Sequence, residues 1–305
     1  MAGSIQERSN ARVTIVVLTR NAERYIERNL SSAIAQDYEP KEVWVVDGES
    51  SDKTVKIARK YAHRIITTGP GFSTAREAAR RLSKAQYIFF MDSDKYAEDQ
   101  LVLSKLVSSL EADPRLGASQ AILRIDQESM KSSILARAEE FRYHRNFSKV
   151  AGRHVDFVVT SATVFRSSAL GDVGGFELAP QVSDDSYISM KLSVRGYSLL
   201  VHESAVVLHR LDEGLCEYLA KAYRGGKGYF MAWKTCGKKA STYMLGSTPA
   251  HALVRGIKMA GAALIDEKDV FLAGFLLIQV TSYYTTFFIG FVAELVLNSL
   301  TRGST

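Results

Sequence analysis

The chain has 305 residues, a formal net charge of +6 and an isoelectric point of about 9.1, so it is long enough for one large domain or two smaller ones. The positive charge fits an anionic substrate or an anionic membrane surface, and because the lysines and arginines are scattered and form no tract, no nucleic-acid partner is expected. The two cysteines, Cys216 and Cys236, form no paired motif, which excludes a disulfide framework and is typical of reduced thiols in an intracellular protein.

Residues 1–12 are polar and contain no apolar run, so we expect a polar N-terminal tail without a secretory signal, followed by a domain that stays in the cytoplasm. Strand and helix patterns then alternate. Buried strands are predicted at residues 13–18, 43–46, 65–66 and 87–91, with helices near residues 25–34, 53–61 and 74–82 and candidate caps at Asn21 and Ser51. The alternation and the short connections predict a doubly wound α/β fold with a mostly parallel sheet. Right-handed crossovers would bring Asp47 and Asp92, at the ends of two strands, to one edge.

Two carboxylates end the fourth strand. Residues 87–91 form a run of five bulky apolar side chains, Asp92 follows directly and Asp94 comes two residues later. Ligands of open α/β sheets bind beyond the carboxyl ends of the strands. Two carboxylates at this place can hold a hard divalent cation such as Mg²⁺ or Mn²⁺. A strand followed by an acidic turn is the alternative interpretation, because the pattern is short.

The middle of the chain continues the alternation. Helices are predicted at residues 99–110 and 130–147, and strands at residues 118–124, 158–165, 199–201 and 205–208, the last of which ends in His209. Residues 171–180 read as a loop, and Ser183, Asp184 and Asp185 open a helix that ends near Gly196. A further helix at residues 215–233 is expected to be broken by the glycines at residues 225–228.

The C-terminal part differs in composition. In a predicted helix at residues 249–265, His251, Arg255 and Lys258 share one face, which indicates an interfacial helix on a membrane or an ordinary surface helix. Residues 270–293 carry no charged side chain and are long enough to cross a bilayer. We therefore predict a transmembrane or deeply membrane-docked helix there, with a buried core helix as the alternative.

Taken together and in order, several segments resemble family 2 glycosyltransferases with a GT-A fold. The resemblance covers residues 13–230. It rests on the segments VTIVVLTRNAERYIERNLSSAIAQDY, EVWVVDGESSDKT, GPGFSTAREAARRLSKAQYIFFMDSD, GGFELAPQVSDDSYISMKLSVRGYSLLV, VVLHR and AYRGGKG. It implies a GT-A catalytic domain at residues 13–235 and a C-terminal helical, membrane-associated region at residues 236–305. The sequence departs from the usual pattern of the family at positions that include Gly48, Glu77 and Tyr187. These departures leave the identity of the sugar open.

The resemblance also implies roles for single residues. Asp185 is the general base, with Asp184 as its acidic neighbour, and the alternative is a pair of acids that only favours the start of a helix. The remaining candidates bind the donor or the metal. Asp47, Arg76, Asp92 and Arg224 bind the donor, with Lys227 as a second candidate beside Arg224, and Asp94, Asp92 and His209 bind Mg²⁺ or Mn²⁺.

The function that follows from the resemblance is inverting transfer from a UDP- or GDP-linked sugar to a hydroxyl of a lipid-linked or surface glycan. The expected partners are the donor, this acceptor and membrane lipids, and the sequence leaves open whether copies of the chain associate into a homo-oligomer. Two alternatives remain: a polyprenyl-phosphate sugar synthase, whose anionic acceptor needs no base, and a non-catalytic nucleotide-sugar-binding membrane protein.

Overall fold

The computed structural model describes residues 12–236 and 248–302, so the predicted polar tail at residues 1–12 lies outside the described part except for its last residue. Four parallel strands form one half of the sheet in the order β3-β2-β1-β4. Their bounds are Val13–Thr19 (β1), Lys41–Asp47 (β2), Arg64–Thr67 (β3) and Tyr87–Asp92 (β4). The residues of β1 are buried throughout, as expected for a strand that is covered on both faces.

The second half of the sheet is mixed. It adds β8 (Ala162–Arg166), β6 (Leu116–Ile125), β9 (Ser198–His209) and β5 (Lys95–Ala97) in this order after β4, and β7 (Arg153–Val155) pairs with β9. The longest of these pairs, β6 with β9, is parallel, whereas β8 is antiparallel to both of its neighbours. The prediction of two separate strands before His209 is wrong, because an irregularity in the pairing of β9 with β6 absorbs the extra residues and the strand continues.

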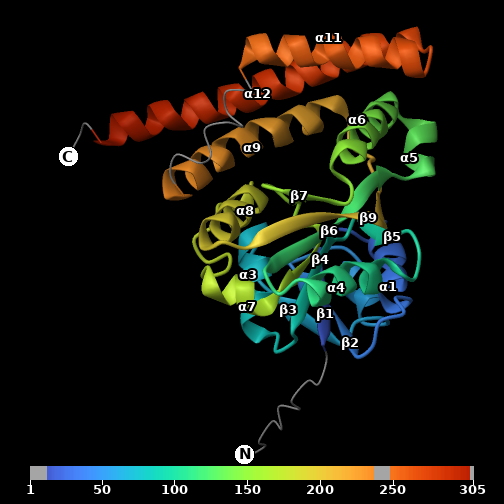
Figure 1. The fold of residues 1–305 in the computed structure, drawn as a ribbon, viewed down its shortest axis with the longest axis vertical. Helices are drawn as coiled ribbons and strands as arrows, with labels where there is room; N and C mark the ends of the chain where they lie inside the picture. The colour runs from blue at the N-terminus through green and yellow to red at the C-terminus, as the bar shows by residue number, and fades with distance from the viewer. Residues whose placement is uncertain (1–11, 237–247, 303–305) are drawn as a thin grey trace, which may run out of the picture.

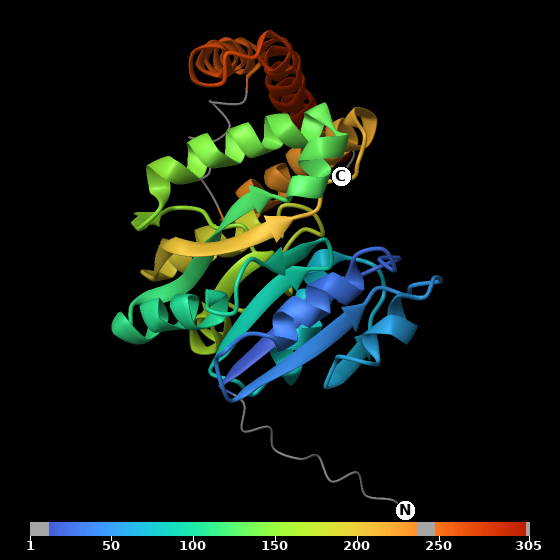
Figure 2. The same ribbon diagram turned by 90° about the vertical axis from the view of Figure 1, so that its right-hand side faces the viewer.

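Helices cover both faces of the sheet, as Figures 1 and 2 show. One face packs against α1 (Ile26–Ile34), α2 (Thr54–Ala58) and α4 (Val102–Ala112), and the other against α3 (Phe72–Leu82), α7 (Ser167–Asp172) and α8 (Asp184–Arg195). Strand β1 contributes Val13, Ile15 and Val17 to the first core, and Val16 and Leu18 to the second. This alternation follows from the two-residue period of a strand.

Asn21 and Ser51, the two residues predicted to cap helices, connect two loops instead. Helix α1 begins at Ile26, and Asn21 instead has a φ of +49° and accepts a hydrogen bond from the Ser51 backbone at 2.9 Å. At the start of α2 the side chain of Asp52 accepts from the Thr54 backbone at 2.9 Å. Asn21 and Ser51 therefore tie the β1–α1 and β2–α2 loops together at the carboxyl edge of the sheet.

The helix predicted at residues 130–147 is two helices. They are α5 (Gln127–Ser132) and α6 (Ile134–Val150). Ser133 separates them, because its backbone is extended and its side chain caps α6 by accepting a hydrogen bond from the Ala136 backbone. Asp126 caps α5 in the same way.

The break predicted at residues 225–228 is also wrong, because α9 runs without interruption over Leu215–Cys236. The glycines serve close packing. A Cβ on Gly226 would lie 1.9 Å from the Phe287 carbonyl oxygen, and one on Gly228 would lie 1.9 Å from the Val182 carbonyl oxygen. Tertiary contacts on both sides of the helix thus stabilise a glycine run that would be a poor helix former by itself.

Two long helices follow α9 beyond a gap in the described residues. Helix α11 (Pro249–Asp266) and helix α12 (Val270–Arg302) pack against each other, and α12 also packs along α9. Figure 1 shows these three helices stacked at the end of the molecule opposite β1, β2 and β3. Within the described part, α12 is the helix whose length and composition would allow it to span a membrane, over Val270–Ser299. Both predicted C-terminal helices are present, and α12 extends beyond residue 293.

We expect Gly226→Ala to lower the free energy of unfolding by about 1–3 kcal/mol, as overpacking does in close-packed interiors. The added methyl would push α12 away from α9, because its neighbour is backbone rather than a flexible side chain. Urea denaturation measures the change. The matched control is Gly261→Ala in α11, where nothing lies within 4 Å of the added Cβ and the substitution should be neutral or stabilising. Equal stability of the two variants would contradict the close packing.

Candidate active site

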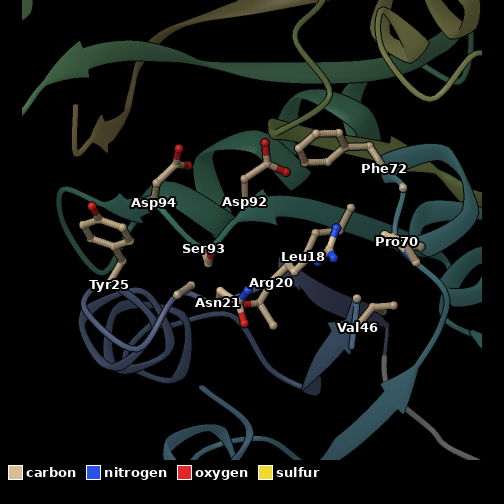
Figure 3. Close-up of a pocket in the computed structure, with 15 residues that line it drawn as sticks. Leu18, Arg20, Asn21, Tyr25, Val46, Pro70, Phe72, Asp92, Ser93 and Asp94 are labelled. Carbon is tan, nitrogen blue, oxygen red and sulfur yellow. The ribbon is translucent and has the colours of Figure 1, made fainter. Parts of the chain in front are cut away.

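A cavity of about 360 Å³ opens at the carboxyl ends of β1 and β4. After β1 the chain builds β2 and β3 on one side and then returns to β4 on the other, and ligands of open α/β sheets bind at such a reversal. The cavity is shown in Figure 3. Its lining comes mainly from the ends of β1, β2 and β4 and from the loops that follow β1 and precede α3, and includes Thr19, Arg20, Tyr25, Gly48, Phe72, Asp92 and Asp94.

The predicted metal carboxylates lie in this cavity. Asp92 and Asp94 point the same way from the end of β4 (Figure 3). The carboxylate of Asp94 lies 2.8 Å from Lys95 Nζ and 3.3 Å from His209 Nε2. The pairing of β5 with β9 places Lys95 opposite His209, so the end of β9 brings this histidine to the carboxylate. Tyr143 of α6 stacks on the ring of His209 with centroids 6.4 Å apart.

The charges around Asp94 favour its ionised form. Burial by itself would raise the pKa of Asp94, but Lys95 and His209 outweigh that effect and hold the pKa well below its ordinary value. Burial would likewise lower the pKa of Lys95, and the carboxylates of Asp94 and Asp92 raise it instead. Lys95 therefore stays protonated, and Asp94 stays in the ionised form that a cation site requires.

The residues present fit a divalent cation that is shared with a ligand. Asp94 supplies oxygen and His209 supplies nitrogen, ligand atoms that suit Mn²⁺ and, for the oxygen, Mg²⁺. No group of three or more His, Cys, Asp or Glu side chains in the described ranges could hold a metal alone. A cation at Asp94 would thus need further oxygen ligands, such as those of a diphosphate, as is usual for Mg²⁺ in nucleotide sites.

Arg76 joins Asp92 to the predicted acid pair. It is 2% exposed, and its two terminal nitrogens donate to Asp184 at 2.7 Å and to Asp92 at 3.0 Å. Asp184 opens α8, whereas Arg76 lies in α3, so the contact brings together segments that are 108 residues apart. The predicted contact of Arg76 with the donor stays a prediction, since both nitrogens already bind carboxylates of the protein.

Asp185 lies next to this buried pair and keeps part of its own surface exposed. Burial, and then the charge of Asp184, raise the pKa of Asp185 to about 7. Burial also raises the pKa of Asp184, although Arg76 opposes the shift. Asp92 and Tyr283 of α12 act on Asp185 electrostatically as well. A carboxyl group that titrates near neutral pH can accept a proton during a reaction, as a general base must.

The raised pKa of Asp185 predicts a dependence of stability on pH. Between about pH 4 and pH 7 the folded protein holds a proton that the unfolded chain has released, so the free energy of unfolding falls as the pH rises through that window. Asp185→Asn removes this dependence. We expect the variant to gain stability over the wild type between about pH 5 and pH 8 in urea denaturation. If the difference in the free energy of unfolding between the variant and the wild type were the same at about pH 5 and about pH 8, the raised pKa would be contradicted.

Asp47 and Arg224 lie outside the lining of the cavity. Asp47 is 2% exposed and accepts hydrogen bonds from the backbone and hydroxyl of Ser50 at 3.0 and 2.5 Å, whereas its neighbour Gly48 lines the cavity. Arg224 is on α9 and pairs with Glu217 at 2.8 Å. The donor-binding roles of Asp47, Arg224 and the nearby Lys227 therefore stay predictions.

The sequence patterns gave no reason to select three residues that matter at this site. Lys95 follows Asp94 directly, and its burial between carboxylates became visible only with the β5–β9 pair. Tyr25 and Phe72 line opposite sides of the cavity (Figure 3). Their signal in the sequence is weak, because an aromatic residue at the start of a helix is usually part of the core.

Residues 14–174, more than half of the chain, match the sequence profile described as "Glycosyl transferase family 2". The chain belongs to this family. This confirms the predicted enzyme class, a family 2 glycosyltransferase. Among curated proteins, the poly-beta-1,6-N-acetyl-D-glucosamine synthase of Staphylococcus aureus (strain COL) is 26% identical over 253 residues, covering 76% of this chain and 60% of the relative. The enzyme of the same name from Staphylococcus epidermidis is 23% identical over 251 residues, with the same coverage. The chain thus spans about 60% of the length of these relatives.

Solved structures show the same fold. The mannosyltransferase PcManGT from Pyrobaculum calidifontis, in complex with GDP-Man and Mn²⁺, has a TM-score of 0.62 at 22% identity, covering 94% of this chain and 87% of the other. The glucosyl-3-phosphoglycerate synthase from Mycobacterium tuberculosis, in complex with Mn²⁺ and UDP, has a TM-score of 0.53 at 16% identity, covering 75% and 81%. These likenesses confirm the predicted GT-A fold of this family 2 glycosyltransferase.

Proposed function

We propose that this family 2 glycosyltransferase catalyses an inverting transfer from a UDP- or GDP-linked sugar to a hydroxyl group. The observation that carries the proposal is the chain of contacts from Asp184 through Arg76 to Asp92. It joins the acid pair of α8 to the end of β4, where the cavity and the Asp94–His209 pair lie. A direct displacement requires a general base and a binding position for the departing diphosphate in the same active site.

In this reaction Asp185 takes the proton of the acceptor hydroxyl as its oxygen forms a bond to the anomeric carbon. The bond from that carbon to the diphosphate oxygen breaks, and the nucleoside diphosphate leaves with the electron pair. Asp94 and His209 would hold the divalent cation, Mg²⁺ or Mn²⁺. When bound, the cation stabilises the negative charge that grows on the leaving group. Lys95 adds a fixed positive charge beside Asp94.

Support for a metal and for a nucleotide-sugar donor also comes from proteins with the same fold. PcManGT was solved with GDP-Man and Mn²⁺, and TarS of Staphylococcus aureus with UDP-GlcNAc, at a TM-score of 0.51 and 17% identity, covering 92% of each chain. We further propose a lipid-linked or surface glycan as acceptor and a catalytic domain that faces the cytoplasm at a membrane. The relatives named as poly-beta-1,6-N-acetyl-D-glucosamine synthases and the apolar C-terminal helix α12 support this part of the proposal.

Incubation with labelled UDP-GlcNAc, UDP-glucose and GDP-mannose, each with Mn²⁺, Mg²⁺ or a chelator, tests the proposal. We expect one donor to release its nucleoside diphosphate in a metal-dependent reaction, and that donor to raise the apparent stability of the protein. The matched control is Asp113→Asn, a carboxylate in the turn after α4 at the opposite edge of the sheet. If a donor binds but no sugar is ever released or transferred, the chain is a binding protein and the proposal is wrong.

A further inference from the structure

The hairpin of α11 and α12 exposes a large apolar surface. Phe271 is 87% exposed and Ile265 is 77% exposed, on either side of the turn between the helices. Further large apolar side chains are exposed along both helices: Leu253, Val254, Ile257, Leu264, Val270, Ile278, Ile289, Leu295, Val296 and Leu297. A surface of this extent, on a stretch of α12 that has no charged residue between positions 270 and 293, indicates contact with a partner or a membrane.

In the N-terminal half of α12, the opposite face of the helix is attached to the catalytic domain by an ion pair and hydrogen bonds. Asp269, just before α12, pairs with Arg137 of α6. Gln279, in the middle of the apolar stretch, is fully buried and donates hydrogen bonds to Glu139 of α6 and, at 3.0 Å, to Tyr218 of α9. The one strongly polar side chain of this stretch therefore points at the domain and away from the exposed apolar face.

The C-terminal half of α12 is fastened to α9 in the same way. The carbonyl of Phe287 lies against Gly226, and Gly290 lies against the backbone of Tyr223. Further on, Glu294 pairs with Lys227 at 3.2 Å and Asn298 accepts from Lys234 at 2.8 Å. From Asp269 to Asn298 the helix advances about 44 Å at 1.5 Å per residue, so the attachment to the domain extends over more than the thickness of a hydrocarbon core.

This attachment decides how α12 can meet a bilayer. Helix α9 carries five charged side chains: Glu217, Lys221, Arg224, Lys227 and Lys234. If α12 crossed the bilayer along its axis, the part of α9 that packs against it would enter the hydrocarbon core together with these charges, which is strongly unfavourable. A helix that lies in the plane of the membrane keeps α9 and its charges on the aqueous side and turns only the exposed face of the hairpin toward the lipid.

We propose that α11 and α12 form a monotopic membrane anchor that lies flat in an anionic bilayer interface and does not cross it. The positive charges of α11 favour an anionic membrane as the partner of this surface. Residues 249–265 of α11 contain no acid, and they contain His251, Arg255 and an exposed Lys258, which attract anionic headgroups. The anchor does not depend on the identity of the donor or acceptor, so it goes beyond the proposed function and can fail separately from it.

The anchor also places the active site relative to the membrane. Gly228 of α9 contacts the backbone of Val182, and the Ser183 hydroxyl donates to the Gly225 carbonyl oxygen at 2.9 Å. These contacts hold the segment before Asp184 and Asp185 against α9, whose neighbouring surface packs on α12. The start of α8, which carries the acid pair, therefore lies next to the layer of helices that lies on the lipid, where a membrane-bound acceptor would arrive.

Flotation of the purified full-length chain with vesicles tests the partner. We expect binding to vesicles of phosphatidylcholine with phosphatidylglycerol, and binding weaker by several-fold to phosphatidylcholine alone. Ile257→Glu and Ile289→Glu should each weaken binding about tenfold, whereas Leu101→Glu, a similarly exposed apolar residue before α4, should not change it. If Ile257→Glu and Ile289→Glu instead abolish a dimer seen by light scattering, and vesicles do not bind, a second copy covers the surface and the proposal is wrong.

Quenching by lipids with nitroxides at different depths tests the orientation. A fluorophore is attached to single cysteines in Phe271→Cys, Ile278→Cys and Ile289→Cys, with Cys216 and Cys236 replaced by Ser. A flat helix predicts one shallow depth for all three positions, about 5–10 Å below the headgroups. A gradient of depth along the helix, with Ile278 near the bilayer centre, would overturn the proposal in favour of a membrane-spanning helix.

Discussion

Asp185→Asn is expected to lower the rate of sugar transfer by about 10²–10⁴-fold, the usual contribution of a positioned general base. The amide cannot take the proton of the acceptor hydroxyl. Because the proposed metal ligands Asp94 and His209 pair with each other at the ends of β4 and β9, affinity for the donor in the presence of Mn²⁺ should change little. Single-turnover transfer of a labelled sugar measures the rate, and nucleotide binding by calorimetry measures the affinity.

The pH profile separates a base from a structural residue. With a pKa of about 7 for Asp185, the wild-type kcat/KM should fall tenfold per pH unit on the acid side of that value, and the residual activity of Asp185→Asn should lack this limb. Asp113→Asn serves as the control and should retain the wild-type profile. Full turnover by Asp185→Asn would show that the acceptor needs no base, as expected for a polyprenyl phosphate.

Asp94→Asn is expected to lower metal-dependent transfer by about 10²-fold or more, because a bound cation supplies several kcal/mol of charge stabilisation in a transition state. The neutral amide is a poorer ligand, and it also leaves His209 and Lys95 without their common carboxylate. The affinity for Mn²⁺ in the presence of the nucleoside diphosphate should fall in parallel. Electron paramagnetic resonance of free Mn²⁺ measures this affinity.

Chelation provides the matching observation. A chelator should abolish transfer by the wild type, and excess Mn²⁺ should restore it, whereas Asp94→Asn should recover only in part at much higher Mn²⁺. His209→Ala should show the same pattern with a smaller effect, since it removes one of the two protein ligands. Transfer that is equally fast in the wild type and in Asp94→Asn, with the same demand for Mn²⁺, would place the metal elsewhere.

The sequence was sufficient to predict what depends on single elements. The apolar run before Asp92 specified a buried strand with two carboxylates at its end, and the order of strands and helices predicted the parallel half of the sheet. The order of segments also predicted that Asp184 and Asp185 open α8. These features follow from periodicity and from the rule that ligands lie beyond strand ends.

What depends on packing between distant elements could not be predicted. Arg76 reads as a residue that could face a ligand, but the approach of α3 to α8 makes it a buried bridge between Asp92 and Asp184. The glycines near Gly226 predicted a break in the helix, but contact with α12 makes them part of a continuous helix. Asp184 lies 108 residues from Arg76 in the sequence, and Gly226 faces Phe287 of α12, a helix whose position no local pattern gives.

The central claim is that the carboxylates of β4 and α8 serve one reaction centre around a metal-bound diphosphate. Anomalous diffraction from crystals grown with Mn²⁺ and the nucleoside diphosphate of the active donor tests it most directly. We predict a single strong peak in contact with the Asp94 carboxylate and the His209 imidazole, with the diphosphate between that peak and Asp185. A peak remote from Asp94, or a diphosphate on the far side of the sheet from Asp185, would contradict the account.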